Sequence, residues 1–307
     1  MFPRTLTLQI DYDQSLKSPK LTVQEAYYKQ KLKTYNLGIY CANDDTVHCF
    51  LYDETVGTIG PNEVISLLDY LLKQLESKLG KHDHIIVWCD NAPGQFKECY
   101  LFFYMDLLIR RGQFLRGDLK FLLEGHTYAV CDRRFGTIQK FLRNQEKIDV
   151  PRKWAIVLEK ANLLNVAVHW VTLDMIKDYK TFLRLEYVSR NEDLEKEKFL
   201  VHDIAWLNFG YGERPGENGL ELVHHPDSVF IRFKIDAKEP PRKVSFIKKK
   251  QRTELRRDFL RTLRRERQPI PIDVKNDCVG LAKDYLTKSA VQFYQSLPAI
   301  DKENKSK

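Results

Sequence analysis

The sequence lacks the patterns that identify several large classes of protein. Its longest apolar run, from about Cys99 to Ile109, is too short to span a membrane. No segment near the N-terminus has the basic, apolar and small-residue order of a secretory signal. The G-x-x-x-x-G-K-[ST] loop that cradles phosphates is absent, and so is the G-x-S-x-G turn of acyl-transfer enzymes. These absences argue against a membrane protein, a nucleotide cofactor and a serine-type acyl transferase.

Paired cysteine motifs are also missing. The six cysteines form no C-x-x-C pair and lie mostly within apolar runs: Cys41, Cys49, Cys89, Cys99, Cys131 and Cys278. We interpret them as reduced core thiols of an intracellular protein and not as disulfides or a zinc site. The His224-His225 pair has no second ligand pair at metal spacing, so we interpret it as ordinary surface.

Positive charge is concentrated in one segment. Residues Arg242 to Arg267 contain twelve Lys or Arg and three acidic residues, a net +9, so the remainder of the chain sums to −1 against the total of +8. Because these charges do not alternate in sign, the segment predicts nucleic-acid contact or nuclear import, and hence a location in the nucleus. The residues expected to contact nucleic acid are Lys248, Lys249, Lys250, Arg252, Arg256, Arg257, Arg264 and Arg265.

The first half of the chain alternates short apolar strands with helical segments. Leu6 to Ile10 predicts a strand that ends on Asp11, and His84 to Cys89 predicts a buried strand that ends on Asp90. The other expected elements are a hairpin of Asn36–Ala42 and Thr46–Tyr52, a helix after Gly60-Pro61, a helix over Phe96–Ile109, a strand at Leu119–Leu123 and a helix after Asp132. This order predicts an α/β fold with the ribonuclease H-like arrangement: a mixed five-stranded sheet, flanked by helices, in which the first strand pairs beside the fourth.

The second half predicts an extension and an arm. We divide the chain into a core of residues 1–150, a C-terminal α+β extension of residues 151–238 packed on that core, and residues 239–307 as a basic arm with a C-terminal helix. Local patterns predict a helix over Val23–Lys33, a Gly/Pro-rich loop at Gly210–Gly219 and one helix over Val274–Leu297.

Three aspartates fall where this arrangement would bring carboxylates together. Asp11 and Asp90 end neighbouring strands, and the helix that begins at Asp132 closes the same edge of the sheet. Metal-dependent phosphodiester chemistry needs two divalent cations roughly 3.5–4 Å apart, and Mg²⁺ or Mn²⁺ prefers such hard oxygen ligands. Each aspartate also has a plainer interpretation, as a turn residue for Asp11 and Asp90 and as a helix N-cap for Asp132. The coincidence of all three on one topology favours a catalytic metal site.

Three spans also resemble the catalytic region of a known family. They are DYDQSLKSPKLTVQEAYYKQKLKTYNLGIY, WCDNAPGQFKE and GHTYAVCDRRFG. They look like the D-x-x-Q…P…YY…L…YN, D-N/S-C-x-G-Q-N-K-N and G-H-T-x-x-x-x-D-R-x-F-G motifs of DDE-type transposases and transposon-derived proteins of animal genomes. A weaker likeness continues toward the C-terminus, at Lys275, Asp277, Leu281, Phe293-Tyr294 and Leu297-Pro298. The resemblance thus covers most of the chain.

This resemblance implies a ribonuclease H-like nuclease and strand-transfer domain that acts on DNA. It implies two Mg²⁺ or Mn²⁺ ions bound by an acidic triad of Asp11, Asp90 and Asp132. DNA and a second copy of the chain, in a homo-oligomer, are the partners that we consider. The residues that it implies beside the site are Asn91, Gln95, His126 and Arg133, although His126 taken alone is equally well a core histidine.

The chain departs from the family beside Asp90. Phe96 and Glu98 stand where the family usually has asparagines, and Ala92-Pro93 replaces the usual Cys-Gly or similar pair. These departures leave open an alternative, a transposase-derived DNA- or protein-binding module without catalysis. A third interpretation is a ribonuclease H-like nuclease without strand transfer. Because the first strand begins almost at residue 1, we do not expect the N-terminal DNA-binding module of full-length transposases within this sequence.

Overall fold

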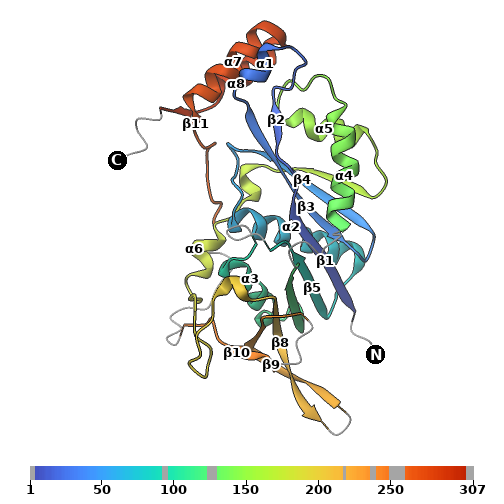
Figure 1. Cartoon of the computed structure of the whole chain (residues 1–307), viewed down its shortest axis with the longest axis vertical. Coiled ribbons are helices and arrows are strands. Elements are labelled where there is room, and N and C mark those ends of the chain that lie inside the picture. Colours follow the sequence, from blue (N-terminus) through green and yellow to red (C-terminus); the bar gives the residue numbers. More distant parts are fainter. Residues whose placement is uncertain are drawn as a thin grey trace.

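The computed structural model describes residues 4–91, 96–122, 130–216, 219–235, 240–248 and 260–301. At Val130, Asp132 and residues 212–216 and 219–227 it describes the backbone alone. Within this part of the chain, ten strands form one mixed sheet (Figure 1). They are β1 (Thr5–Tyr12), β2 (Leu16–Ser18), β3 (Leu32–Cys41), β4 (Thr46–Asp53), β5 (His84–Cys89), β6 (Arg116–Phe121), β7 (Val166–Trp170), β8 (Trp206–Gly216), β9 (Gly219–Arg232) and β10 (Arg242–Val244). The order across the sheet is β10-β9-β8-β6-β5-β1-β3-β4-β7, and β2 pairs with β3 outside this path.

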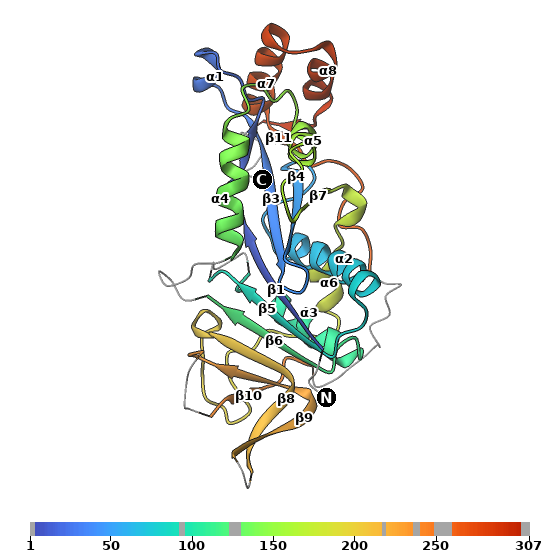
Figure 2. The ribbon, with the colours of Figure 1, turned by 90° about the vertical axis from the view of Figure 1, so that its right-hand side faces the viewer.

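Helices lie on both faces of this sheet. They are α1 (Glu25–Tyr28), α2 (Pro61–Leu79), α3 (Cys99–Arg110), α4 (Val130–Arg143), α5 (Arg152–Lys160), α6 (Tyr179–Leu183), α7 (Ile272–Tyr285) and α8 (Lys288–Ser296). Figure 2 shows α4 on one side of the strands and α2, α3 and α6 on the other. The remaining described elements are the 3-10 turns η1 (Leu173–Met175) and η2 (Val201–Asp203) and a small parallel pair, β11 (Ile270–Pro271) with β12 (Ala299–Ile300).

The five strands predicted for the core are adjacent in the sheet, in the order β4-β3-β1-β5-β6. β1 pairs parallel with β5, from Thr5 opposite His84 to Ile10 opposite Cys89, and antiparallel with β3. β4 pairs antiparallel with β3, and β6 pairs parallel with β5. The predicted neighbours, β1 and β5, are therefore confirmed, and so is the hairpin of β3 and β4 that extends the sheet.

The sheet is larger than the five strands predicted. β7, from the segment expected to form an extension on the core, pairs parallel with β4. β8, from the same segment, pairs antiparallel with β6 at the opposite side. Without these strands the backbone N–H and C=O groups along β4 and β6 would lack partners in the sheet. The extension thus continues the core sheet at both edges.

Two helix predictions are wrong in extent. The helix predicted over Val23–Lys33 is reduced to one turn, α1, because the chain enters β3 at Leu32, whose side chain is buried against the C-terminal helices. The helix predicted over Val274–Leu297 is divided into α7 and α8. Thr287 separates them with an extended backbone, and its hydroxyl oxygen accepts a hydrogen bond from Ala290 N at 3.3 Å, which caps α8.

The segment Gly210–Gly219 is predicted as a loop, but its described residues, 210–216 and 219, belong to the strands β8 and β9. Gly210 has a positive φ of 79° at a bulge in this pairing, a backbone conformation that favours glycine. A Cβ at Gly210 would also lie 2.6 Å from the carbonyl oxygen of Leu115. In Figure 1 the far end of this hairpin extends beyond the rest of the described chain.

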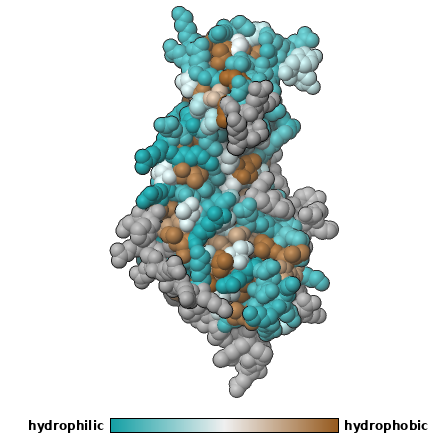
Figure 3. Space-filling model, turned by 90° about the vertical axis from the view of Figure 1, so that its left-hand side faces the viewer, coloured by the Kyte–Doolittle hydropathy of each residue, from teal (hydrophilic) through white to brown (hydrophobic). Residues whose placement is uncertain are grey.

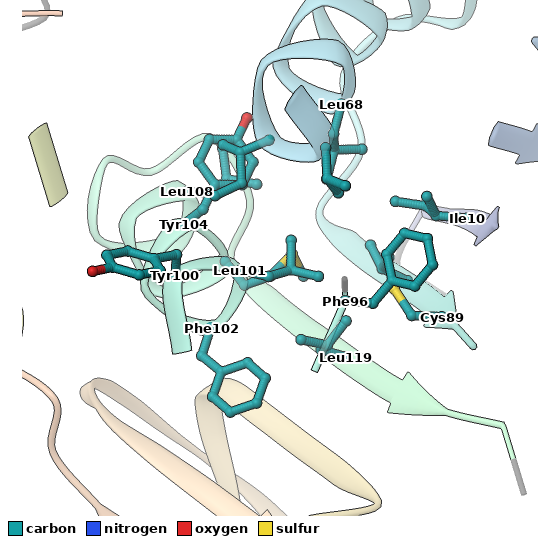
Figure 4. Packing of buried hydrophobic residues seen from close by; sticks show 14 of the residues in the cluster. Ile10, Leu68, Cys89, Phe96, Tyr100, Leu101, Phe102, Tyr104, Leu108 and Leu119 are labelled. Carbon is teal, nitrogen blue, oxygen red and sulfur yellow. The ribbon is translucent and has the colours of Figure 1, made fainter. Parts of the chain in front are cut away.

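Alternating side chains of the central strands face two different cores. Leu6, Leu8 and Ile10 of β1 belong to an apolar cluster with α2 and α3, and the matching residues of β5 belong to the same cluster. Figure 4 shows Phe96 beside Cys89 and Ile10 in this cluster. A second cluster joins α4 and α5 to β4 on the other face. In the view of Figure 3 the hydrophobic side chains that are coloured lie in separate small groups among hydrophilic ones.

The helix α4 runs along β1 on the second face. At its start, Cys131 N donates to Gln9 Oε1 at 3.4 Å, and two turns later Gln139 Nε2 donates to Asp13 Oδ2 at 2.9 Å. From Cys131 to Gln139 the helix advances by about 12 Å, and from Gln9 to Asp13 the extended chain advances by about 13 Å. These contacts therefore require the helix and the strand to run in the same direction.

The distance between α4 and the sheet depends on Gly38. This residue of β3 pairs with Asp11, and the Phe135 ring of α4 packs directly on it. A Cβ at Gly38 would lie 2.3 Å from Phe135 Cζ and 2.4 Å from Cε1. Any larger residue at position 38 must therefore displace the helix or the ring.

We predict that Gly38→Ala lowers the free energy of unfolding by about 1–3 kcal/mol, the usual effect of overpacking a core. Adding Phe135→Leu, which removes the clashing ring atoms, should recover part of this loss in a double-mutant cycle measured by urea unfolding. Gly136→Ala is the matched control, because a Cβ at Gly136 meets nothing within 4 Å. Strict additivity of the two changes would mean that α4 does not pack on Gly38.

A histidine pair joins β4 to β7, where the extension meets the core. His48 Nδ1 lies 3.1 Å from His169 Nε2, and the His169 ring stacks on Phe50 with 4.5 Å between the ring centroids. Burial and then the neighbouring His169 lower the pKa of His48 to about 4, and burial lowers the pKa of His169. Both rings are therefore neutral in the folded chain at pH values where an unfolded chain protonates them.

We predict that this pair weakens the fold in mild acid. Because the folded-state pKa values are depressed, the unfolded chain binds more protons, and stability falls as pH drops from about 6.5 toward 4. His48→Gln retains a polar group beside His169 and removes one proton site. The variant should lose less stability than the native chain over that range, by up to about 3 kcal/mol, in urea unfolding at a series of pH values. Parallel curves for the two proteins would contradict this account.

Candidate functional site

Asp11 and Asp90 are neighbours at the carboxyl ends of two central strands, β1 and β5. The parallel register pairs Ile10 with Cys89, so one further step along both strands brings Asp11 opposite Asp90. Neighbouring strands lie about 4.8 Å apart, and successive side chains of a strand point to opposite faces. Since Ile10 and Cys89 point into the core beneath α2 and α3, the two aspartates lie on the face that carries α4. Two of the three predicted carboxylates are therefore side by side.

The charges of these aspartates act on the buried thiol beside them. Burial raises the pKa of the Cys89 thiol, and the negative charges of Asp11 and Asp90 raise it further. Each carboxylate is also oriented by the backbone that follows it. Asp11 Oδ1 accepts a hydrogen bond from Tyr12 N at 2.7 Å, and Asp90 Oδ1 accepts one from Asn91 N at 2.8 Å.

The third predicted carboxylate belongs to the first turn of α4. Asp132 is the third residue of this helix, whose start lies against Gln9 of β1, so its backbone is helical and not that of an N-cap. The Asp132 side chain lies outside the described part of the structure. Among the side chains that are described, no group of three or more His, Cys, Asp or Glu is arranged to hold a metal ion. The described geometry therefore consists of two carboxylates with the helix turn of the third beside the same strand.

The other predicted neighbours of the site differ in their placement. Asn91 follows Asp90 directly, and Arg133 is exposed on α4, one residue beyond Asp132. Gln95 and His126 lie outside the described residues.

Lys97 is a neighbour of the site that the sequence did not reveal. Its Nζ donates to Asn91 Oδ1 at 2.6 Å and lies 5.1 Å from the centroid of the Phe121 ring on β6, and the residue is only 8% exposed. Lys97 therefore holds the side chain of the residue after Asp90 and adds a positive charge beside the carboxylates. The one available signal was a lysine between Phe96 and a long apolar run.

Aromatic rings hold the two strand ends together from the core side. The Phe96 ring is fully buried and stacks on Tyr12 with 5.7 Å between the centroids. The hydroxyl oxygens of Tyr12 and Tyr52 lie 2.8 Å apart, in a hydrogen bond that ties β1 to β4. These contacts limit movement of the chain on either side of the aspartates.

A row of alternating indole and cationic side chains crosses the sheet beside Asp90. Trp88, Lys120, Trp206 and Arg232 occupy directly opposite positions on β5, β6, β8 and β9, and we call them the indole–cation row. Lys120 Nζ lies 5.2 Å from the Trp88 ring centroid and 4.0 Å from a Trp206 ring centroid, and Arg232 Cζ lies 5.2 Å from Trp206. Their strand neighbours point into the core, so the row lies on the face of Asp90.

A buried carboxylate fixes the orientation of this row. Asp118 of β6 is 2% exposed and accepts hydrogen bonds from Trp206 Nε1 at 2.7 Å, Asn208 Nδ2 at 2.6 Å and Tyr211 OH at 2.8 Å. His84 Nε2 lies 2.6 Å from its other oxygen. Burial alone would raise the pKa of Asp118, but the hydrogen bonds from His84, Trp206 and Tyr211 outweigh it and hold the pKa below its ordinary value. Asp118 is therefore a structural anion that orients the Trp206 indole.

Some cations of the segment Arg242 to Arg267 form contacts with other parts of the same chain. Lys248 Nζ donates to the carbonyl oxygen of Arg184, and Arg264 forms an ion pair with the buried Glu63 at 3.4 Å. Arg265 is exposed. The other predicted contacts lie outside the described residues, namely Lys249, Lys250, Arg252, Arg256 and Arg257. Nuclear import by this segment stays a prediction.

Comparisons with known proteins identify a family for this chain. Searches of curated proteins and of solved structures gave no match. Within the described residues, no helix has the length and apolar character needed to cross a membrane. A family model described as Domain of unknown function (DUF7869) matches residues 24–203, more than half of the 307 residues, and this range includes Asp90 and Asp132. The chain therefore belongs to the DUF7869 family of domains of unknown function.

Proposed function

We propose that this chain is a DDE-type transposase-like domain that cuts and joins DNA phosphodiester bonds by two-metal catalysis. One observation carries the proposal: the parallel register of β1 and β5, which makes Asp11 and Asp90 neighbours at the carboxyl ends of adjacent strands. The strand order β4-β3-β1-β5-β6 supports it, because a central first strand beside the fourth is what a ribonuclease H-like sheet requires. Ligands of α/β sheets bind at such carboxyl ends.

The donor set fits Mg²⁺ or Mn²⁺. Asp11 and Asp90 offer hard carboxylate oxygens from two different elements, and Asp132 on the first turn of α4 is the proposed third ligand. When bound, two such ions lower the pKa of the attacking water or hydroxyl and stabilise the leaving oxygen. Other residues of the chain position the carboxylates. Lys97 holds Asn91 beside them, and the stacked Phe96 and Tyr12 rings hold the strand ends in register.

The departure at Phe96 is compatible with this chemistry. Its ring is buried in the core beneath the carboxylates, so it replaces a polar residue of the family by a packing residue. Glu98 precedes α3 at the N-cap position without a side-chain cap. Ala92 and Pro93 lie outside the described residues.

The indole–cation row supports a nucleic-acid substrate. Aromatic faces stack on bases of any sequence, and cations beside them attract the phosphate backbone. Trp88 lies two residues before Asp90 on the same face, so a strand bound across the row would pass beside the carboxylates. Binding of nucleic acid by the indole–cation row would not need the carboxylates. The row therefore also favours a second candidate function, a DNA-binding module without catalysis.

We predict that Mg²⁺ or Mn²⁺ raises the melting temperature of the native chain, because it relieves repulsion among the clustered carboxylates. At a concentration about 100 times Kd, the stabilisation is about 2.7 kcal/mol for each ion bound. Asp90→Asn, Asp11→Asn and Asp132→Asn should fold, lose most of this shift and abolish metal-dependent nicking of terminal-repeat DNA. Asp284→Asn, on the exposed face of α7, is the matched control. An undiminished metal shift in the three variants would reject the site.

The row gives a separate prediction about binding. Trp88→Ala should weaken binding of a labelled single-stranded oligonucleotide by about 1–3 kcal/mol, the effect of one stacked base. Lys120→Met keeps the apolar stem between the two indoles but removes the charge, so the slope of log affinity against log salt should become shallower by about 0.7. Lys283→Met, exposed on α7, is the control. Unchanged affinity and slope, measured by fluorescence anisotropy, would mean that the row only stabilises the sheet.

A further inference from the structure

A cavity lined by basic side chains lies at the far end of α4 from the carboxylates. It has a volume of about 350 Å³, is open to solvent, and is bordered by the connection from β1 to β2, the last turn of α4 and the start of α5. Its lining contains no Asp or Glu. The polar side chains that matter for its chemistry are Gln14, Lys17, Lys20, Lys31, Gln139 and Arg143.

One of the four cations is fixed by the end of the helix. Lys20 Nζ donates to the carbonyl oxygens of Leu142 at 3.1 Å and Arg143 at 2.7 Å, and it lies 5.7 Å from the centroid of the Trp154 ring. The C-terminal carbonyls of α4 carry partial negative charge, which holds the ammonium in place. Lys20 is therefore a structural part of the cavity wall.

Of the other three cations, Arg143 lies close enough to the Asp13 carboxylate for its charge to lower the pKa of that group, which burial raises. Within the described residues, the head groups of Lys17, Lys31 and Arg143 form no ion pair and no hydrogen bond. Burial lowers the pKa of the Lys31 ammonium, and the positive charge of Lys17 lowers it further, which shows that these two head groups repel each other. Like charges around a hollow are unfavourable until an anion enters. The cavity thus has the electrostatics of an anion site.

The cavity lies near the end of β1 that carries Asp11. Gln14 lies three residues after Asp11, at most about 10 Å along an extended chain. Gln139 lines the cavity and donates to Asp13 Oδ2 at 2.9 Å, directly after the end of β1. An extended polyanion that reached the carboxylates could therefore continue along α4 into the cavity.

We propose that this cavity binds a backbone phosphate of a nucleic-acid strand whose reacting phosphodiester lies at Asp11 and Asp90. This inference rests on the proposed function, since the position of the reacting group comes from it. The guanidinium of Arg143 offers a planar pair of donors that matches phosphate oxygens, and Lys17 and Lys31 act as point charges. The site binds the strand without reading its sequence, because every nucleotide carries the same phosphate.

The test uses the full chain with Lys17→Gln, Lys31→Gln and Arg143→Gln combined, leaving Lys20 to cap α4. Binding of a labelled single-stranded oligonucleotide, followed by anisotropy, should weaken at least tenfold at low salt. The slope of log affinity against log salt should become shallower by about 2, since each lost contact on a single strand removes about 0.7. Lys140→Gln, which removes one exposed charge from the same helix outside the cavity, should change affinity less than Arg143→Gln alone. If the triple variant is unstable, Lys17→Gln alone should still lower the slope by about 0.7.

Three results would overturn the proposal. Unchanged oligonucleotide binding together with lost stabilisation by inorganic phosphate would make the cavity a site for small free phosphates. Equal weakening of polyglutamate and oligonucleotide binding would show attraction to any polyanion. If the triple variant binds oligonucleotide and inorganic phosphate as the native chain does, the cavity binds no anion. If metal fails to raise the melting temperature of the native chain while the triple variant loses oligonucleotide binding, the metal site fails and phosphate binding at the cavity stands.

Discussion

The pairing of β1 with β5 is the contact on which the candidate site depends. Leu6, Leu8 and Ile10 must enter the core beneath α2 and α3, and this requirement fixes which way the intervening residues point. A slip of one residue would turn Asp11 into that core and Ile10 toward α4. The burial of apolar side chains thus determines where the charges lie. Gly38 and Phe135 add the second constraint, because they hold α4 close to the strand that bears Asp11.

The face that carries α4 is organised by charge. Two aspartates lie at its centre, with the indole–cation row on one side and the basic cavity on the other. A polyanion would be attracted at both ends and repelled at the middle. In the proposed function, divalent cations at the aspartates would remove that repulsion, and the arrangement would couple strand binding to metal binding. Asp118 takes no part in this coupling, because its charge is already satisfied by buried hydrogen bonds.

The sequence allowed prediction of features that depend on local pattern. Apolar runs that end on Asp11 and Asp90 identified two strands, and their order along the chain predicted that they pair. The row of Trp88, Lys120 and Trp206 could not be predicted, because it depends on the register of strands from distant parts of the chain. The same limit concealed the role of β7 and β8, because their partners β4 and β6 lie about 120 and 90 residues earlier in the chain. Lys97 was missed because a lysine carries no signal of burial until its partner is known.

The position of β7 and β8 has a consequence for how the molecule can be divided. The segment up to residue 150 contains the central strands and the candidate site, yet on its own it would end in two bare strands, β4 and β6. Such strands invite pairing with other chains and aggregation. The family match, which ends at residue 203, includes β7 but stops just before β8. The match also begins at residue 24, after β1, so a fragment cut to the family boundaries would leave β3, β5 and β6 each lacking at least one strand partner. A fragment in which these strands keep their partners therefore runs from β1 through the hairpin of β8 and β9.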